Sequence, residues 1–381
     1  MVDEYQVCTR CVMDTSDPGI TFDENGVCSS CRRYEEVREQ RGYRPGVSER
    51  ELERTVSLMK EKSAKLDYDC ILGISGGVDS AYMLHLAYKL GLRVLAVHVD
   101  SGWNSEIGVR NIERMCQKLN VQLHTFVMDW PTMKELQRAY LLSGVANLDV
   151  PQDHLFCAAV YHMAKKYQVK YILNGSNIAT EGAAAPFSMQ QSYRDTWHLN
   201  SIYKRHGRGR SLRKYPRLSI WRAWFGLHGV TKINLLDYVP YSKTEAIALL
   251  SREYGWEYYG GKHFESRFTK YFQSVYLPRK YHFDKRRSQL SCLVMNGEMT
   301  REAALQELAV PPYPVEQQRE DEAYILKKLD IAPEEWAKVL SAPPTPNEAY
   351  FSQAKLFALA QRMLGKGGLD RMKKRIYSVE G

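Results

Sequence analysis

The sequence predicts an α/β protein in which helices cover both faces of a parallel sheet. A small zinc-binding unit precedes this sheet domain, and a mostly helical region follows it. Apolar runs alternate with amphipathic stretches from residue 67 onward, and four cysteines near the start form two C-x-x-C pairs. A length of 381 residues suits two or three such units. We therefore predict a zinc ribbon at 1–40, a connecting helix at 41–66, the sheet domain at 67–250, and a helical substrate or partner region at 251–381.

The zinc ribbon is predicted from Cys8, Cys11, Cys28 and Cys31, whose two pairs are separated by sixteen residues. Between them, residues 21–27 predict two short strands around an Asn-Gly turn. Four thiolates at this spacing close a tetrahedral Zn²⁺ shell and leave no position for water, which indicates a structural site. Redox chemistry and an iron–sulfur cluster are the alternatives.

The connecting segment is charged and predicts helices at 35–41 and from Ser48 onward. Ser48 is followed by Glu51 at the capping-box spacing. We interpret this segment as a solvated linker helix.

The sheet domain follows from the alternation of buried strands and helices. Strands are expected at 70–74, 94–99, 121–127 and 171–173. Helices are expected at 80–90, 106–119 and 155–167, and a further one at 243–254. Continuous apolar strands of this kind indicate a parallel sheet that is buried on both faces. Ligands in such sheets bind at the carboxyl ends of the strands.

A hexapeptide of small residues, Ser75–Ser80 with the sequence SGGVDS, ends the first strand and opens the next helix. Backbone N–H groups at a helix start bind anions, and glycines let the backbone approach a pyrophosphate closely. Asp79 would repel a phosphate unless a cation lies between them, which indicates a Mg²⁺ contact. The loop does not have the Walker A spacing. A simple Gly-rich turn is the structural alternative.

In this position the hexapeptide resembles the PP-loop of the ATP pyrophosphatase superfamily, whose Rossmann-like fold is also called adenine nucleotide alpha-hydrolase-like. The resemblance implies that ATP is split between its α- and β-phosphates. A carbonyl or amide oxygen is adenylylated, and a nitrogen or sulfur nucleophile then displaces AMP. The ATP-binding positions that it implies are Gly73, Ile74, Ser75, Gly76, Gly77, Val78, Asp79, Ser80, His98, Val99, Asp100, Met128, Gly175 and Ser176.

Two segments far apart in the chain carry a narrower resemblance. Residues 8–18 and 22–28, together with 262–270, 277–280, 284–287 and 297–302, resemble the N-acetyl sugar amidotransferases of WbpG type. The resemblance covers roughly residues 5–305. It implies a role in lipopolysaccharide O-antigen synthesis, where an acetamido oxygen is adenylylated and ammonia replaces AMP to give an amidine. The implied substrate is a UDP-linked di-N-acetylated mannuronic acid, or a nonulosonic acid in related pathways.

Candidate residues for this chemistry come from the loop and from the basic distal segment. Predicted catalytic residues are Asp79, Ser80, Lys262, Arg267 and Lys285. Predicted substrate-binding residues are Asn177, Glu181, Lys270, Lys280, Arg286 and Arg287. Glu181 is equally interpreted as a Mg²⁺ ligand or a surface acid. The basic residues are otherwise a solvated helical face or a partner interface.

The expected source of ammonia is a separate protein. A glutaminase with an N-terminal nucleophile needs cysteine where the chain has Val2, and Cys157 does not lie in a nucleophile elbow. The resemblance implies a HisH-like glutaminase subunit, as in the histidine pathway, and a HisF-like channel protein. The zinc ribbon is then either their docking surface or a clamp on a small module.

The charge is +9, with 53 basic and 44 acidic residues. Such a surface attracts phosphates, nucleotide sugars, nucleic acid or an acidic protein. A tRNA thiolase is therefore the main rival, and residues 203–217 interleave tyrosine with arginine as RNA-binding segments do. Thiolases use paired active-site cysteines, which are not evident here, so nucleic acid is not the expected partner. A non-catalytic protein with a relic loop is the second rival, and the intact hexapeptide argues against it.

We expect a cytoplasmic location. The start MVDEYQVCTR carries two acids and lacks an apolar core, and no stretch approaches eighteen uncharged apolar residues.

Overall fold

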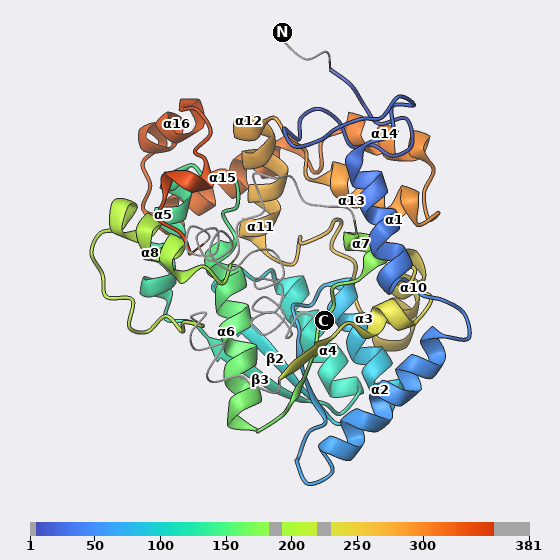
Figure 1. Cartoon of the computed structure of the whole chain (residues 1–381). Coiled ribbons are helices and arrows are strands. Elements are labelled where there is room, and N and C mark those ends of the chain that lie inside the picture. Colours follow the sequence, from blue (N-terminus) through green and yellow to red (C-terminus); the bar gives the residue numbers. More distant parts are fainter. Residues whose placement is uncertain (1–4, 183–192, 219–229, 354–381) are drawn as a thin grey trace, which may run out of the picture.

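The computed structural model describes residues 5–182, 193–218 and 230–353. Part of the predicted helical region 251–381 therefore lies outside the described residues, as do ten residues at 183–192 and eleven at 219–229. Figure 1 shows a central sheet flanked by helices, with the N-terminal unit resting on helices from the second half of the chain.

The central sheet has five parallel strands in the order β3-β2-β1-β4-β5. They are β1 (Cys70–Gly73), β2 (Val94–Asp100), β3 (Gln122–Val127), β4 (Tyr171–Leu173) and β5 (Thr231–Ile233). The predicted parallel sheet is confirmed, and four of its strands were expected. The strand β5 was missed because three residues give too short a pattern. The strand order reverses between β1 and β4, which is where such sheets bind ligands.

Helices cover both faces of the sheet, as predicted. Because side chains alternate along a strand, Leu72 faces one layer and Ile71 the other. The first layer contains α2 (Ser48–Lys62), α3 (Val78–Lys89), α4 (Glu106–Lys118) and α10 (Lys243–Tyr254). The second contains α6 (Val150–Lys166). Figure 1 shows α6 in front of β2 and β3.

A second group of helices builds its own core beside the sheet. Its members are α5 (Trp130–Ser143), α8 (Thr196–His206), α11 (Arg267–Tyr271), the π-helical turn η3 (Phe272–Tyr276), α12 (Leu277–Tyr281), α15 (Val315–Leu329) and α16 (Pro333–Ser341). The helical C-terminal region is thereby confirmed. The sequence analysis missed α5, whose first turn is capped by the Asp129 carboxylate. Most of its residues are buried, so it carries little of the amphipathic period that reveals a surface helix.

The N-terminal unit is more irregular than expected. It leads into α1 (Ser29–Arg41), which contains the predicted helix 35–41. Around the turn at Gly26 only a single bridge forms, between Phe22 and Cys28, where two short strands were predicted. Ser48 is the first residue of α2 rather than its cap, and its hydroxyl accepts from the Arg44 N–H.

The remaining elements are α7 (Ile178–Glu181), η2 (Leu235–Tyr238), α13 (Arg286–Met295), α14 (Arg301–Ala309) and η4 (Asn347–Ala349). Of these, α7 and α13 contact each other and α1. The buried side chains of Tyr34 in α1, Ile178 in α7 and Cys292 in α13 pack into one small cluster. Among the described helices, none combines the length and apolar character that crossing a membrane requires.

The segment after α10 crosses the carboxyl ends of the strands. It is joined to the loop after β2 by an antiparallel Asn104–Ser266 bridge, which consists of two hydrogen bonds: the Ser105 N–H to Glu265 O at 2.7 Å and the Arg267 N–H to Trp103 O at 2.8 Å. The helical region therefore builds one site together with the sheet. A division at residue 250 would cut through α10.

Candidate active site

The phosphate loop lies between β1 and α3 in the predicted strand–loop–helix setting. Gly76 has a φ of +83°, and a Cβ there would lie 2.3 Å from the Gly108 carbonyl oxygen, so only glycine fits. The N–H groups of Ser75, Gly77 and Val78 donate to the hydroxyls of Ser80, Ser75 and Tyr259 respectively. Phosphate oxygens can replace these hydroxyls as acceptors. The loop is thus preformed for an anion at the start of α3.

Asp79 lies at the centre of a polar cluster above the loop. Its Oδ1 accepts from the Tyr241 hydroxyl, and from Asn177 Nδ2 at 3.3 Å. Its Oδ2 lies 3.7 Å from Lys262 Nζ. Burial, together with the Asp79 carboxylate, raises the pKa of Tyr241 far above its usual value. The tyrosine therefore stays protonated and donates to the carboxylate.

Lys262 is the cation of this cluster. Its ammonium lies 3.0 Å from Glu181 Oε1 and 3.1 Å from Thr180 Oγ1, and it also faces Asp79. Burial disfavours its charge, but Glu181 and Asp79 outweigh burial and raise the pKa of Lys262. Burial also disfavours the Glu181 carboxylate, and Lys262 lowers its pKa. Lys262 and Glu181 are therefore both ionised at neutral pH.

The carboxylates of this cluster are of the kind that Mg²⁺ binds. The Lys262 ammonium already lies beside two of them, Asp79 and Glu181. Asn177 faces Asp79 with its amide nitrogen, and its Oδ1 accepts from the Thr180 N–H, so this side chain offers no free oxygen. Carboxylate oxygens are hard ligands that Mg²⁺ takes together with substrate phosphates, and Asp79 and Glu181 would hold such an ion.

Residues predicted to bind the nucleotide divide into two groups. Gly73, Ile74, Ser75, His98, Val99 and Ser176 line the cavity. Burial lowers the pKa of His98. Its Nδ1 donates to Ile74 O at 3.2 Å and its Nε2 accepts from Asn104 at 3.1 Å, so it is a neutral positioning group.

Asp100 and Met128 differ from this expectation. Asp100 Oδ1 accepts from the Gly102 N–H at 2.8 Å, and Met128 is 5% exposed within the apolar cluster of the helical region. Gly175 has a supporting role, because a Cβ there would lie 3.3 Å from the Ser80 nitrogen. Its small size lets the loop after β4 pack against the first turn of α3.

A cavity of about 570 Å³ extends from the phosphate loop across the strand ends. Its far wall is formed by α6, the turn before α11, η3 and the start of α13. The polar residues there that the sequence analysis missed are Asn147, Asp149, Asp153, His263, Glu265, Ser266, Thr269 and Gln273. Three of them, Asp153, Thr269 and Gln273, lie on helical elements, and the others lie in loops and turns. His263, Glu265, Ser266 and Thr269 did carry a signal, because they fall within the segment 262–270 that prompted the family resemblance.

The acids of the cavity differ in protonation. Burial raises the pKa of Asp153 to about 6, and burial raises that of Asp149 well above its usual range. Asp149 accepts from Gln152 and Thr269. Glu265 remains ionised, because His263 lowers its pKa against the effect of burial. This wall offers both neutral and charged oxygens to a hydroxylated substrate.

Lys285, a predicted catalytic residue, lines this cavity. Its ammonium makes no hydrogen bond or ion pair to any of the described residues. Burial, with Lys262 nearby, lowers the pKa of Lys285 to about 8. The Lys285 ammonium would therefore pair with an anion bound in the cavity.

Five other basic residues that were predicted to act on substrate lie outside the cavity lining, and each of them contacts other groups of the protein. Arg267 Nε and Lys270 Nζ lie 2.6 and 2.7 Å from the carboxylate of Asp321 in α15, which is 4% exposed. They neutralise a buried acid between helices. The Arg267 guanidinium also stacks 3.8 Å from the centre of the Tyr324 ring.

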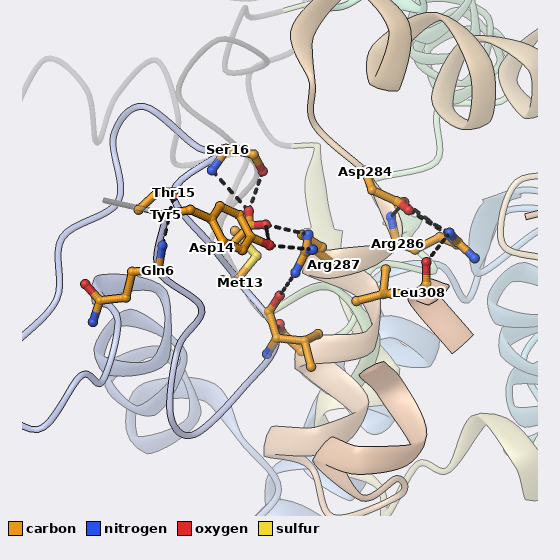
Figure 2. Close-up of polar contacts among 12 residues, drawn as sticks. Tyr5, Gln6, Met13, Asp14, Thr15, Ser16, Asp284, Arg286, Arg287 and Leu308 are labelled. Atoms are coloured by element: carbon orange, nitrogen blue, oxygen red, sulfur yellow. Dashed lines mark hydrogen bonds and ion pairs between the residues drawn. The ribbon is translucent and has the colours of Figure 1, made fainter. Parts of the chain in front are cut away.

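Arg286 and Arg287 hold the N-terminal unit and the following helices together (Figure 2). Arg287 contacts the Asp14 carboxylate at 2.9 Å and the Val12 carbonyl at 2.7 Å. Arg286 pairs with Asp284 and donates to the carbonyls that end α14, including that of Leu308. Their partners lie far along the chain, so the local sequence did not reveal these roles.

Lys280 has a structural role that predicts a clear effect on stability. It is 4% exposed, and its ammonium donates to the carbonyls of Val339, Ala342 and Pro343, which end α16. The change Lys280→Met removes three charge-assisted hydrogen bonds and should lower the free energy of unfolding by about 3 kcal/mol. Urea denaturation measures this loss. A stable variant with a raised KM for the sugar would instead restore Lys280 as a substrate residue.

The interleaved tyrosines of residues 203–217 are anchors rather than stacking surfaces. The Tyr203 hydroxyl donates to Arg210 O, and the Tyr215 hydroxyl donates to Pro151 O at 2.6 Å. Tyr215 is 2% exposed. Since single-stranded RNA is bound on exposed aromatic faces, this segment does not have the geometry of an RNA-binding platform.

The four cysteines of the N-terminal unit converge on one point. Their sulfurs lie within 4.8 Å of one another, all buried, and the closest pairs are 3.6 to 3.8 Å apart. A tetrahedron with Zn–S bonds of about 2.3 Å separates its sulfurs by about 3.8 Å. Backbone N–H groups of Arg10, Cys11 and Cys28 also point at Cys8 Sγ, as they do toward thiolates. The cluster therefore fits a structural Zn²⁺.

Two family models match this chain, one over the segment with the phosphate loop and one over the segment that begins at Glu265. The family model of the queuosine biosynthesis protein QueC matches residues 69–178. The model of the LPS biosynthesis protein WbpG-like C-terminal domain matches residues 265–364. The search of curated proteins found no match.

Two solved structures resemble the chain at low similarity. NMN synthetase from Francisella tularensis is 20% identical with a TM-score of 0.27, over 34% of this chain and 55% of that one. The chain thus spans about half the length of that protein. The NH3-dependent NAD synthetase from Campylobacter jejuni subsp. jejuni NCTC 11168, in complex with the nitrate ion, is 15% identical with a TM-score of 0.29. That match covers 55% of this chain and 93% of the other.

The parallel sheet, the SGGVDS loop and the QueC match support an ATP-dependent enzyme of PP-loop type. Residues 265–364 are in addition similar to the C-terminal domain of WbpG-like LPS biosynthesis proteins.

Proposed function

We propose that the chain is an amidine synthase, which uses ATP and ammonia to replace the acetamido oxygen of an N-acetylated sugar by nitrogen. The observation that supports this most directly is that two segments far apart in sequence line one cavity. Glu265, where the WbpG-like match begins, has its Oε1 3.4 Å from Ser75 Oγ in the phosphate loop. An enzyme that adenylylates a sugar needs the sugar and the α-phosphate in one enclosed space.

In the first step, the acetamido oxygen attacks the α-phosphate and pyrophosphate leaves. The N–H groups of the loop hold the phosphates at the start of α3. Lys262 neutralises charge on the departing pyrophosphate. Mg²⁺, held by Asp79 and Glu181, would screen the remaining phosphate charge.

The far wall of the cavity suits the sugar. Asp149 is protonated and can donate one hydrogen bond, whereas Glu265 is ionised and accepts hydrogen bonds from hydroxyls. Lys285 supplies a positive charge for an acidic substrate or its diphosphate. We infer a nucleotide-linked, N-acetylated sugar acid, destined for bacterial surface polysaccharide of the O-antigen kind.

We propose that a separate glutaminase, HisH-like and with a HisF-like channel protein, supplies the ammonia in the cytoplasm. Cys157 is the one cysteine that lines the described cavity. It is half-buried on α6, and burial raises its pKa, so it lacks the activation that a glutaminase nucleophile needs.

The test is a product assay with ATP, Mg²⁺, nitrogen-15 ammonium and a panel of UDP-linked N-acetylated sugar acids. Sugar-dependent release of AMP and pyrophosphate is expected, with the label in the sugar. Mass spectrometry of the product then identifies the amidine. If tRNA and a sulfur donor release AMP while every sugar fails, the enzyme is a thiolase and the proposal is wrong.

The role of Lys285 predicts a pH dependence of substrate binding. Its ammonium is charged below about pH 8 and loses its proton above that value. The KM for an anionic sugar nucleotide should therefore rise as the pH increases through about 8. The variant Lys285→Met should have a raised KM that does not change over this range. Steady-state kinetics on both proteins measures the difference, and a parallel rise in the variant would contradict the assignment.

A further inference from the structure

His263 occupies a strained position at the edge of the cavity. Its φ of +65° is left-handed, which is uncommon for a residue other than glycine. The turn is fixed on both sides. Lys262 before it binds Glu181, and the Glu265 carbonyl after it accepts from the Ser105 N–H at 2.7 Å. The imidazole is consequently held against the cavity, which it lines.

The imidazole faces carboxylates from three directions. Its Nδ1 lies 3.8 Å from Glu265 Oε1 in the same turn. Asp153 on α6 and Glu181 on α7 interact with it electrostatically across the cavity. The nearby cations are Lys262, which is paired with two carboxylates, and Lys285, which lines the same cavity. Glu265 is the carboxylate for which a close contact with the imidazole is seen.

Glu265 connects the imidazole to the reacting phosphate. Its Oε1 lies near both His263 and the Ser75 hydroxyl, and its Oε2 is buried with no hydrogen-bond partner among the described residues. The Glu265 carboxylate therefore lies next to both the His263 imidazole and the phosphate loop. A group in this position would lie near the adenylylated carbon of the proposed intermediate, because that carbon is joined through oxygen to the α-phosphate.

We infer that His263, oriented by Glu265, is the general base of the ammonia step. This inference rests on the proposed function. The lone pair of ammonia forms the C–N bond to the adenylylated carbon, and a proton of the resulting ammonium goes to the free ring nitrogen of His263. The C–O bond to AMP then breaks with its electron pair on AMP, and a nitrogen lone pair completes the new C=N bond. Because the former amide nitrogen keeps its proton throughout, the product leaves as the amidinium ion, and His263 releases its proton to solvent.

The two steps can be measured separately. Sugar-dependent exchange of pyrophosphate into ATP reports the adenylylation, and labelled amidine reports the ammonia step. In the variant His263→Asn, amidine formation should fall about 100-fold, the smaller end of the effect of a general base. The exchange should stay within a few-fold of the wild type. Asparagine tolerates the left-handed backbone, so the turn is kept.

Two further measurements separate catalysis from structure. Added imidazole should partly restore amidine formation in His263→Asn. When hydroxylamine replaces ammonia, the rate should fall less in this variant, because hydroxylamine is a weaker base than ammonia and arrives deprotonated. The matched control is His282→Asn, since His282 is exposed at the end of α12 with a similar φ of +55°. It should leave both steps unchanged.

Each result is decisive. If amidine formation in His263→Asn stays near the wild-type rate, His263 is not the base. If exchange and amidine formation fall together and imidazole restores neither, the residue acts in folding or in adenylylation, and the inference is wrong. A wild-type enzyme with no sugar-dependent exchange would instead remove the proposed function, and this inference with it.

Discussion

Replacing Asp79 by asparagine should lower sugar-dependent formation of AMP and pyrophosphate about 100- to 1000-fold. The Asp79 carboxylate lies between Tyr241, Asn177 and Lys262, and it faces the start of α3 where the phosphates bind. Asparagine keeps the shape and accepts the Tyr241 hydrogen bond, but it removes the charge that would hold Mg²⁺. Pyrophosphate release with saturating ATP is the measurement.

The control for this variant is Glu106→Gln, the same loss of charge in the first turn of the neighbouring helix α4. Glu106 is exposed and does not line the cavity, so activity should stay at the wild-type level. Thermal unfolding of the two variants should be similar. Turnover of Asp79→Asn within a few-fold of the wild type would remove the cation-binding role of this carboxylate.

The second large effect is expected for Cys11→Ser, which opens the thiolate tetrahedron. The variant should lose its zinc and several kcal/mol of stability, since zinc binding contributes on the order of 10 kcal/mol in small zinc modules. The loss of stability should extend beyond the N-terminal unit, because Arg301 donates to the carbonyls of Cys8 and Cys11, and Arg287 donates to the carbonyl of Val12. These contacts anchor α13, the helix that follows Lys285. Elemental analysis and thermal unfolding measure the two losses.

Cys116→Ser is the matched control, because Cys116 is equally buried but lies on α4 outside the cluster. It should keep about one zinc per chain, as expected for a single tetrahedral site. A Cys11→Ser protein that is as stable as the control without zinc would contradict a structural metal. A protein that stays folded and keeps zinc would point to a different set of ligands.

Sequence patterns predicted the elements that carry their own local signal. The four apolar strands β1 to β4, the loop between Ser75 and Ser80 and the paired cysteines all lie within short windows, where backbone geometry and residue type are directly linked. The helix α5 and the strand β5 were missed for opposite reasons. Most of α5 is buried and has little periodicity, and β5 has three residues.

The candidate site divides in the same way. Asp79 and Lys262 were predicted and meet in one cluster, whereas Glu265, Tyr241 and Asp153 were not identified as site residues. Tyr241 is an example. In sequence it is an ordinary tyrosine before α10, and only packing brings its hydroxyl to Asp79, 162 positions earlier. No window of the sequence contains that pair.

What the sequence determined by itself was the phosphate loop, the metal cluster and the parallel sheet that aligns the strand ends. Each depends on residues close together in the chain, whose spacing dictates which groups converge. Only the tertiary structure decided the role of each charged side chain. Lys285 lines the cavity and Lys262 pairs with Asp79 and Glu181, while Arg287 forms an ion pair with Asp14, 273 positions earlier. The sequence does not distinguish a basic residue in the site from one that holds two helices together. Its role is set by the acid or carbonyl that folding brings to it.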